Sequence, residues 1–152
     1  MESCASEFYH EVVAPTVSDF LNRPHDRRLA CLACLCLSSM AVHYIHAVAE
    51  PAKISKEISS FWTAVRAENW AVGQVHDIAN ATKHVIRRGP GVGYGDVSSQ
   101  QIVVGNLRAG WPFAGMQVMV EVEPGNVWLV KDLVEAANQW WRDKLTLPIK
   151  EA

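Results

Sequence analysis

The chain has 152 residues and a formal net charge of −2, with 49% hydrophobic and 20% charged residues. This length suits one domain with one hydrophobic core, and the composition is that of a folded globular protein rather than a disordered one. The near-neutral charge argues against nucleic-acid binding, which needs a concentrated basic surface, and the nearest candidate is the short pair Arg87-Arg88. We therefore expect a single globular domain without a nucleic-acid partner.

The amino end reads MESCASEFYHEVV, with acidic residues early and no basic segment leading into an apolar one. This pattern is not that of a secretory signal, so a cytoplasmic location is expected. Three of the four cysteines, Cys31, Cys34 and Cys36, lie in one apolar segment. Free cysteine behaves there as a small hydrophobic residue, and we expect the thiols to be reduced and buried.

The first half of the chain shows helical spacing of apolar residues. Pro15 marks either a kink or the true start of the first helix, Asp26 is placed to cap the second, and Pro51 to end it. The predicted helices cover roughly residues 6–22, 27–50, 55–68 and 70–88.

The second of these helices has no formally charged side chain from Leu29 to Ala49, and this length could span a membrane. Ser38, Ser39 and His43 would be costly in hydrocarbon, and the rest of the chain has the pattern of a soluble domain. A central helix of a bundle is the favoured interpretation, and no membrane contact is expected.

The second half changes in character. GPGVGYGD opens a glycine-rich connection over residues 89–99, and the β-favouring runs QIVVG and MQVMVEVEPGNVWLV follow within residues 100–130. Val118, Val120 and Val122 are expected on one face, with Val127 and Leu129 on the return strand. An amphipathic helix covers 131–147. The prediction is a single α+β domain over 1–152: an N-terminal four-helix bundle (1–88), a small antiparallel hairpin sheet and a C-terminal helix.

Polar residues form a stripe on the fourth predicted helix, within VHDIANATKH at residues 75–84. Asp77, Asn80 and His84 lie opposite its apolar side, and the second helix carries a similar stripe of His43, His46 and Glu50. If helices alternate in direction through short loops, the second and fourth run parallel and the two stripes converge.

Such a cluster has the chemistry of a divalent metal site for zinc, iron or manganese. His43, His46, Asp77 and His84 would hold the metal, Glu50 would act as a ligand or base, and the candidate catalytic residues are His84, Asp77 and Asn80. The alternative is a buried polar network in which Asp77 pairs with Lys83, Asn80 cross-links helices and His84 donates to a carbonyl. In that case no cofactor is expected.

The tryptophans suggest an interface. Trp111 lies in a loop poor in polar residues, and the adjacent Trp140 and Trp141 must point about 100° apart on a helix. One of the two can be core while the other lies near the surface. All three are candidates for contact with a second copy or another protein, with extra core packing as the alternative.

Three stretches, HDIANATKH, FWTAVRAEN and VWLVKDLVEAANQWW, carry a resemblance to a set of small uncharacterised bacterial proteins. In these proteins a helical half with an Asp-x-Ala-Asn/Lys-Ala-x-Lys-His helix precedes a β segment and a final helix. The resemblance implies this fold and a bacterial origin, without an assigned activity.

More remotely, the chain is similar to HEPN helical bundles, many of which are ribonucleases or toxin–antitoxin components. That similarity implies an RNA-acting role with Lys83, Arg87 and Arg88 as phosphate contacts and His84 as the acid–base group. The HEPN Arg-x4–6-His motif is not found at the equivalent helix, where Asn80 and Lys83 precede His84.

Taken together, these patterns favour a soluble, homodimeric, non-enzymatic interaction or regulatory module. A metal-dependent hydrolase and a HEPN-like RNA-acting protein remain as alternatives.

Overall fold

The computed structural model describes residues 4–85, 102–104, 117–123 and 126–146. Its first helical run consists of α1 (Cys4–Phe8), the π-helical turn η1 (Tyr9–Val13) and α2 (Ala14–Asn22). Pro15 lies in the first turn of α2, directly after the π turn, whose wider spacing accepts a residue without a backbone N–H. The predicted first helix therefore passes through Pro15 by way of a π turn.

The central helix of the fold is α3 (Arg27–Val48), which packs against α1, α2, α4, α5 and α6. Its start is capped as predicted, because the Asp26 carboxylate accepts from the Leu29 N–H at 3.1 Å. By length and composition α3 could cross a membrane. Within its most apolar stretch of 18 residues, 39% is buried inside the fold. Leu37 and Met40, both fully buried, hold it in the core.

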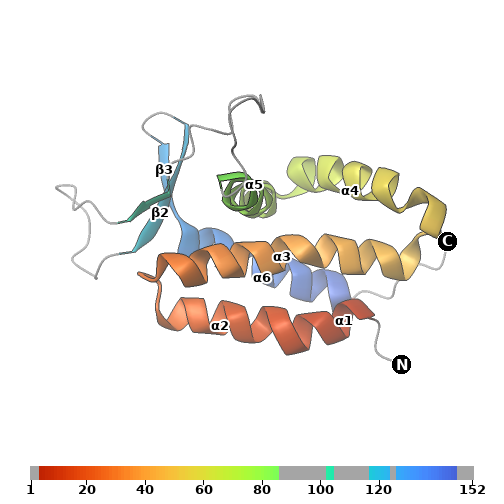
Figure 1. The fold of residues 1–152 in the computed structure, drawn as a ribbon, viewed down its shortest axis with the longest axis horizontal. Coiled ribbons are helices and arrows are strands. Elements are labelled where there is room, and N and C mark those ends of the chain that lie inside the picture. Colours follow the sequence, from red (N-terminus) through yellow and green to blue (C-terminus); the bar gives the residue numbers. More distant parts are fainter. Residues whose placement is uncertain (1–3, 86–101, 105–116, 124–125, 147–152) are drawn as a thin grey trace.

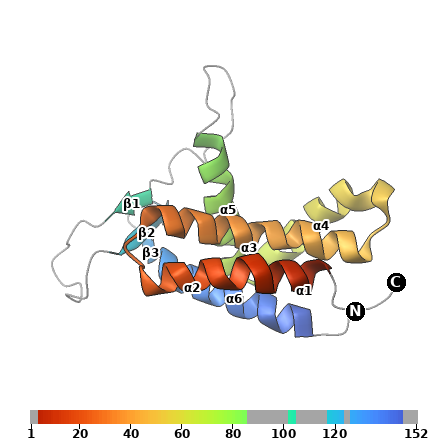
Figure 2. The same ribbon diagram turned by 60° about the horizontal axis from the view of Figure 1, so that its bottom comes forward.

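After the short 3-10 turn η2 (Pro51–Lys53) come α4 (Ile54–Glu68) and α5 (Trp70–Val85). Asn69 separates the two helices, and its side-chain oxygen accepts from the Val72 N–H at 3.2 Å. In Figure 1 α5 is seen end-on while α3 lies horizontally, and Figure 2 shows α5 running across α3. The predicted parallel arrangement is wrong, since the corner at Asn69 turns α5 away from the bundle direction.

The sheet has the strand order β1-β2-β3, with β1 (Ile102–Val104), β2 (Val118–Glu123) and β3 (Asn126–Leu129) all antiparallel. Val120 lies opposite Trp128 and Met119 opposite Leu129. Val118 and Val120 therefore share a face with Trp128, and not with Val127 and Leu129 as the sequence suggested. The side-chain period of a strand is two, so a one-residue difference in register exchanges the faces.

The C-terminal helix α6 (Val130–Thr146) follows β3 without a loop and lies beside the N-terminal helices (Figure 2). It packs against α2, α3 and α5, and the Tyr9 hydroxyl donates to the Asn138 side chain at 2.8 Å. Its buried residues are Val130, Leu133, Val134, Ala137 and Trp141.

The predicted α+β class is confirmed in outline: mainly helices, a small antiparallel sheet and a C-terminal helix. The N-terminal helices do not close the core alone, because α6 supplies part of it. The predicted connection at 89–99 lies outside the described residues.

Candidate functional site

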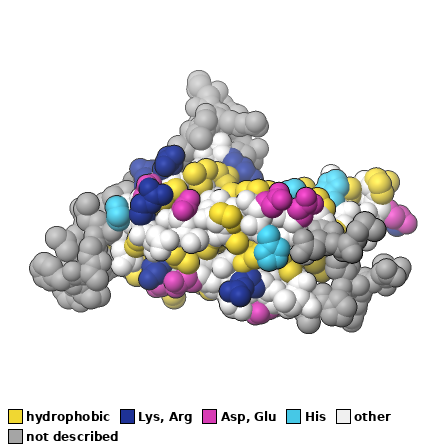
Figure 3. Space-filling view, turned by 90° about the horizontal axis from the view of Figure 1, so that it is seen from below, with side chains coloured by type: hydrophobic (Ala, Val, Ile, Leu, Met, Phe, Trp, Pro, Cys, Tyr) yellow, Lys and Arg dark blue, Asp and Glu magenta, His cyan; other side chains and the backbone are white. Residues whose placement is uncertain are grey.

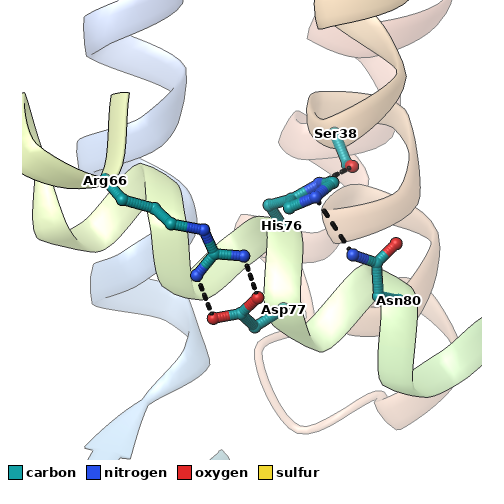
Figure 4. A network of polar contacts seen from close by, with 5 residues as sticks. All are labelled: Ser38, Arg66, His76, Asp77 and Asn80. Carbon is teal, nitrogen blue, oxygen red and sulfur yellow. Dashed lines mark hydrogen bonds and ion pairs between the residues drawn. The ribbon is translucent and has the colours of Figure 1, made fainter. Parts of the chain in front are cut away.

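A polar network lies where α5 crosses α3, and His76 is its centre (Figure 4). The His76 Nδ1 lies 2.8 Å from the Ser38 Oγ of α3, and its Nε2 lies 3.0 Å from the Asn80 Nδ2, one turn further along α5. The imidazole stacks on the Trp62 indole of α4, with ring centroids 3.7 Å apart and planes 13° apart. Three helices thus meet at one imidazole.

The hydrogen bonds of His76 define its tautomer. The Asn80 amide nitrogen can only donate, so Nε2 accepts and the ring proton lies on Nδ1. Nδ1 then donates to the Ser38 hydroxyl oxygen. Because Ser38 is only 5% exposed, this bond satisfies a buried hydroxyl, and both ring nitrogens of His76 are engaged.

Burial, as the largest cause, and the positive charges of Arg66 and Lys83 together lower the pKa of His76 from 6.5 to about 4, while the negative charge of Asp77 opposes the shift. The imidazole is therefore neutral at neutral pH, in agreement with one accepting and one donating nitrogen. A Ser38 hydroxyl that accepts from the imidazole, away from solvent, is not arranged as a nucleophile beside its base. The contacts of this network join α3, α4 and α5.

A second polar contact joins α4 to α5 beside the first. Arg66 donates two hydrogen bonds to the Asp77 carboxylate, one of them Nη1 to Oδ2 at 2.7 Å and the other Nη2 to Oδ1. This bidentate pair raises the pKa of Arg66. Gly73 faces the stem of Arg66: a Cβ placed there would lie 3.1 Å from the Arg66 Cγ. The absence of a side chain at residue 73 lets the arginine lie flat on α5.

The structure brings together only part of the predicted metal cluster. Asp77 and Asn80 lie on α5 in the network, whereas His43 stacks on Phe8 and Glu50 pairs with Lys53 at 2.7 Å. His46 is exposed near the end of α3, and the side chain of His84 lies outside the described part. Within the described residues, no group of three or more His, Cys, Asp or Glu side chains could hold a metal ion.

The crossing of α5 over α3 explains this separation. Two stripes on helices that cross meet only at the crossing point, and that point holds Ser38 and His76. His43 and His46 lie further along α3, toward α1 and α4. The predicted convergence of His43 and His46 with Asp77 is therefore not found.

A polar network is present on α5 as predicted, but its residues contact partners other than the predicted ones. Asp77 pairs with Arg66 instead of Lys83, which is exposed, and Asn80 contacts His76 on its own helix instead of cross-linking two helices. His76 itself was not among the predicted residues, because it lies between the two faces of α5. The four-residue spacing between His76 and Asn80 could have indicated their contact, because residues at this spacing are neighbours on a helix. Arg87 and Arg88 lie outside the described residues.

The three tryptophans that were predicted to lie at an interface differ in their surroundings. Trp141 is fully buried between Tyr44 and Phe61, so an interface role for it is wrong, although the predicted core position for one of the pair is confirmed. Trp140 is half-buried and donates to Glu68 at 3.1 Å. Trp111 lies outside the described residues.

An aromatic pair that the sequence did not single out lies on the surface. Trp70 begins α5 and is 43% exposed, and Trp128 on β3 is 40% exposed. Their ring centroids are 4.7 Å apart with an angle of 55° between the planes. Other large hydrophobic side chains are exposed at Val12, Leu32, Val42 and Val48. On the face seen in Figure 3, hydrophobic side chains lie interspersed with charged groups and histidines.

All four cysteines are free thiols. Of the three that were predicted to be buried, only Cys34 is; Cys31 and Cys36 are partly exposed, and Cys4 is exposed. No protein-family model, curated protein or solved structure matches the chain.

Proposed function

We propose that this protein is a non-enzymatic interaction module that forms a cytoplasmic homodimer through a surface centred on Trp70 and Trp128. The observation that supports the proposal is the exposure of two tryptophans in contact, one from the start of α5 and one from β3. Tryptophan is enriched at the centres of protein interfaces, where it buries a large area with few rotatable bonds. Neighbouring exposed rings of this size favour a partner over solvent.

The polar side chains at the crossing of α3 and α5 already have partners within the fold. His76, Ser38 and Asn80 satisfy one another inside the fold, and Asp77 is paired with Arg66. These contacts give His76, Asp77 and Asn80 of α5 partners within the fold. Trp70 and Trp128 contact each other through their rings, and both remain more than a third exposed.

A second copy is the proposed occupant because one of the exposed rings lies on an end strand of the sheet. Among the described strands β3 is at the edge, and pairing of β3 with a twofold-related β3 would bring the Trp128 side chains of two copies close together. In a twofold dimer one surface meets itself, so a single tryptophan pair is enough to build both halves of the interface.

Sedimentation velocity over a range of protein concentrations tests the proposal. The wild-type chain is expected to sediment as a dimer, and Trp70→Ser and Trp128→Ser as monomers, because each removes an aromatic anchor from the centre of the contact. Val42→Ser is the matched control, since Val42 is 41% exposed on α3, and it is expected to remain dimeric.

A wild-type chain that stays monomeric at about 100 μM, or tryptophan variants that dimerise as the wild type does, would overturn the proposal. Circular dichroism of each variant separates the loss of a dimer from the loss of the fold.

A further inference from the structure

We propose that Cys4 and His43 form a thiol–imidazole pair that makes Cys4 a site of mixed-disulfide formation with small-molecule disulfides. Cys4 lies in α1 and its side chain is exposed. Its Sγ is 3.6 Å from the Nδ1 of His43, which is 39 residues away in the chain and lies in α3. This pair is separate from the His76 network and from the tryptophan surface.

The fold holds the imidazole in place against the thiol. Phe8, one turn along the same helical run from Cys4, stacks on the His43 ring with centroids 3.8 Å apart and planes 13° apart. The amino-terminal helical run thus contacts the imidazole twice, once through the Phe8 ring and once through the Cys4 sulfur. Stacking restricts the ring orientation and keeps Nδ1 directed at the thiol.

The electrostatic surroundings favour a neutral imidazole. Partial burial lowers the pKa of His43, and the neighbouring His46 of α3 lowers it further, so the ring is neutral at pH 7. With its proton on Nε2, the ring directs the Nδ1 lone pair at the Cys4 thiol of α1. A neutral imidazole in this position can act as a general base that accepts the thiol proton as the sulfur attacks.

The remaining cysteines provide an internal comparison. Cys34 is completely buried, and burial raises the pKa of its thiol. Burial also raises the pKa of Cys36, which is half-buried. Cys31 is partly exposed and serves as the reference thiol. Reactivity with a soluble disulfide requires both access and thiolate character, and Cys4 combines exposure with an adjacent base.

The chemical step is a thiol–disulfide exchange. The Cys4 proton passes to His43 Nδ1, and the sulfur attacks one sulfur of the small disulfide, forming a new S–S bond. The original S–S bond breaks, and its second sulfur leaves with the electron pair and takes up the proton. Cys4 is oxidised to a mixed disulfide, and the leaving half of the small disulfide is reduced to a thiol.

The test uses the full chain, reduced and then exposed to oxidised glutathione at pH 7 for a series of short times. Peptide mass spectrometry measures the modified fraction of each cysteine. Cys4 is expected to react about tenfold faster than Cys31. His43→Phe keeps a ring to stack on Phe8 but lacks Nδ1, and it is expected to slow Cys4 by on the order of tenfold. His25→Gln, an exposed histidine before α3, is the control and is expected to leave the rate unchanged.

A second measurement distinguishes a His43 that acts as a base from a His43 that only supports the local structure. At pH values well above the ordinary thiol pKa, hydroxide ionises Cys4 in both proteins, so the rates of wild type and His43→Phe should converge. The proposal fails if Cys4 reacts no faster than Cys31, if His43→Phe reacts as fast as wild type at pH 7, or if the two rates stay apart at high pH. His43→Gln repeats the comparison without an aromatic ring, and an unslowed Cys4 in that folded variant also overturns the proposal.

Discussion

The imidazole of His76 lies flat on the indole of Trp62, with ring centroids 3.7 Å apart, while its two nitrogens contact Ser38 and Asn80. One residue of α5 thereby holds α3 and α4 in a defined position. A stacked, neutral and fully hydrogen-bonded histidine at a helix crossing acts on stability and on specificity of packing. The predictions below test that role and the packing around it.

Replacing His76 by Phe keeps a ring over Trp62 but removes both nitrogens. The buried Ser38 hydroxyl and the Asn80 amide then lose a partner, and we expect unfolding to become easier by about 1 to 3 kcal/mol. Urea denaturation followed by circular dichroism measures the change. In the double variant Ser38→Ala/His76→Phe the loss should be smaller than the sum of the single losses, because the unpaired hydroxyl is gone. Strict additivity would contradict the contact.

Stability should fall as the pH is lowered from 6.5 toward 4. The pKa of His76 is about 4 in the folded state, against an ordinary 6.5, so the unfolded chain binds more protons in this window. The contribution of His76 is fully present above pH 6.5 and is lost as the pH falls through about 4. Allowing for solvent screening of this partly exposed group, its size is about 1 to 2 kcal/mol.

Urea midpoints of wild type and His76→Phe measured between pH 7 and pH 4 check this. The variant should lose less stability over the window than wild type, and His25→Gln should behave as wild type. Equal slopes for wild type and His76→Phe would show that His76 does not titrate between its folded and unfolded values.

The charges of Arg66 and Asp77 should act on His76 in opposite directions. Arg66 lowers the pKa of His76 and Asp77 raises it. Arg66→Gln is therefore expected to move the pKa of His76 upward, and Asp77→Asn to move it further down. Chemical shifts of the His76 ring protons measured by NMR across pH report both changes. Shifts in the same direction for the two variants would be inconsistent with this arrangement.

Gly73 should tolerate only the smallest side chain. A Cβ at this residue meets the Arg66 Cγ at 3.1 Å and the Arg66 Cα at 3.6 Å. Ala gains helix propensity of up to about 1 kcal/mol, which offsets the displacement of the arginine stem, so Gly73→Ala should leave the melting temperature nearly unchanged. Gly73→Leu must push α4 away from α5 and should cost about 2 kcal/mol or more. A Gly73→Leu protein as stable as wild type would mean that the two helices are not in close contact here.

Trp141 and Trp70 offer a matched comparison between core and surface. Trp141 is 0% exposed and Trp70 is 43% exposed. Trp141→Ala should destabilise the fold by about 3 to 5 kcal/mol through the cavity it leaves, whereas Trp70→Ala should cost less than about 1 kcal/mol in a chain held monomeric by dilution. Thermal unfolding of both variants makes the comparison, and similar losses would contradict the assigned burial.

Much of the architecture could be predicted from local signals. Apolar residues at helical spacing, the Asp26 cap and the breaker Pro51 are short-range features, and α3 begins and ends close to where they indicate. The turn sequence between β2 and β3 and the amphipathic pattern of α6 likewise need no knowledge of the rest of the fold. These elements follow from backbone sterics and periodicity, which the order of residues contains directly.

Only the tertiary structure decided which elements meet and at what angle. The corner at Asn69 turns α5 across α3, and this places His76, which the sequence did not single out, against Ser38. The register between β2 and β3 shifts between Glu121 and Glu123, and it pairs Val120 with Trp128, so that these two side chains share a face.

Periodicity shows which face of an element is apolar but carries no information on crossing angles or register, because these depend on how distant side chains fill the space between elements. The sequence by itself therefore determined the helices, the strands and the polar stripe of α5, and packing decided the partners of that stripe.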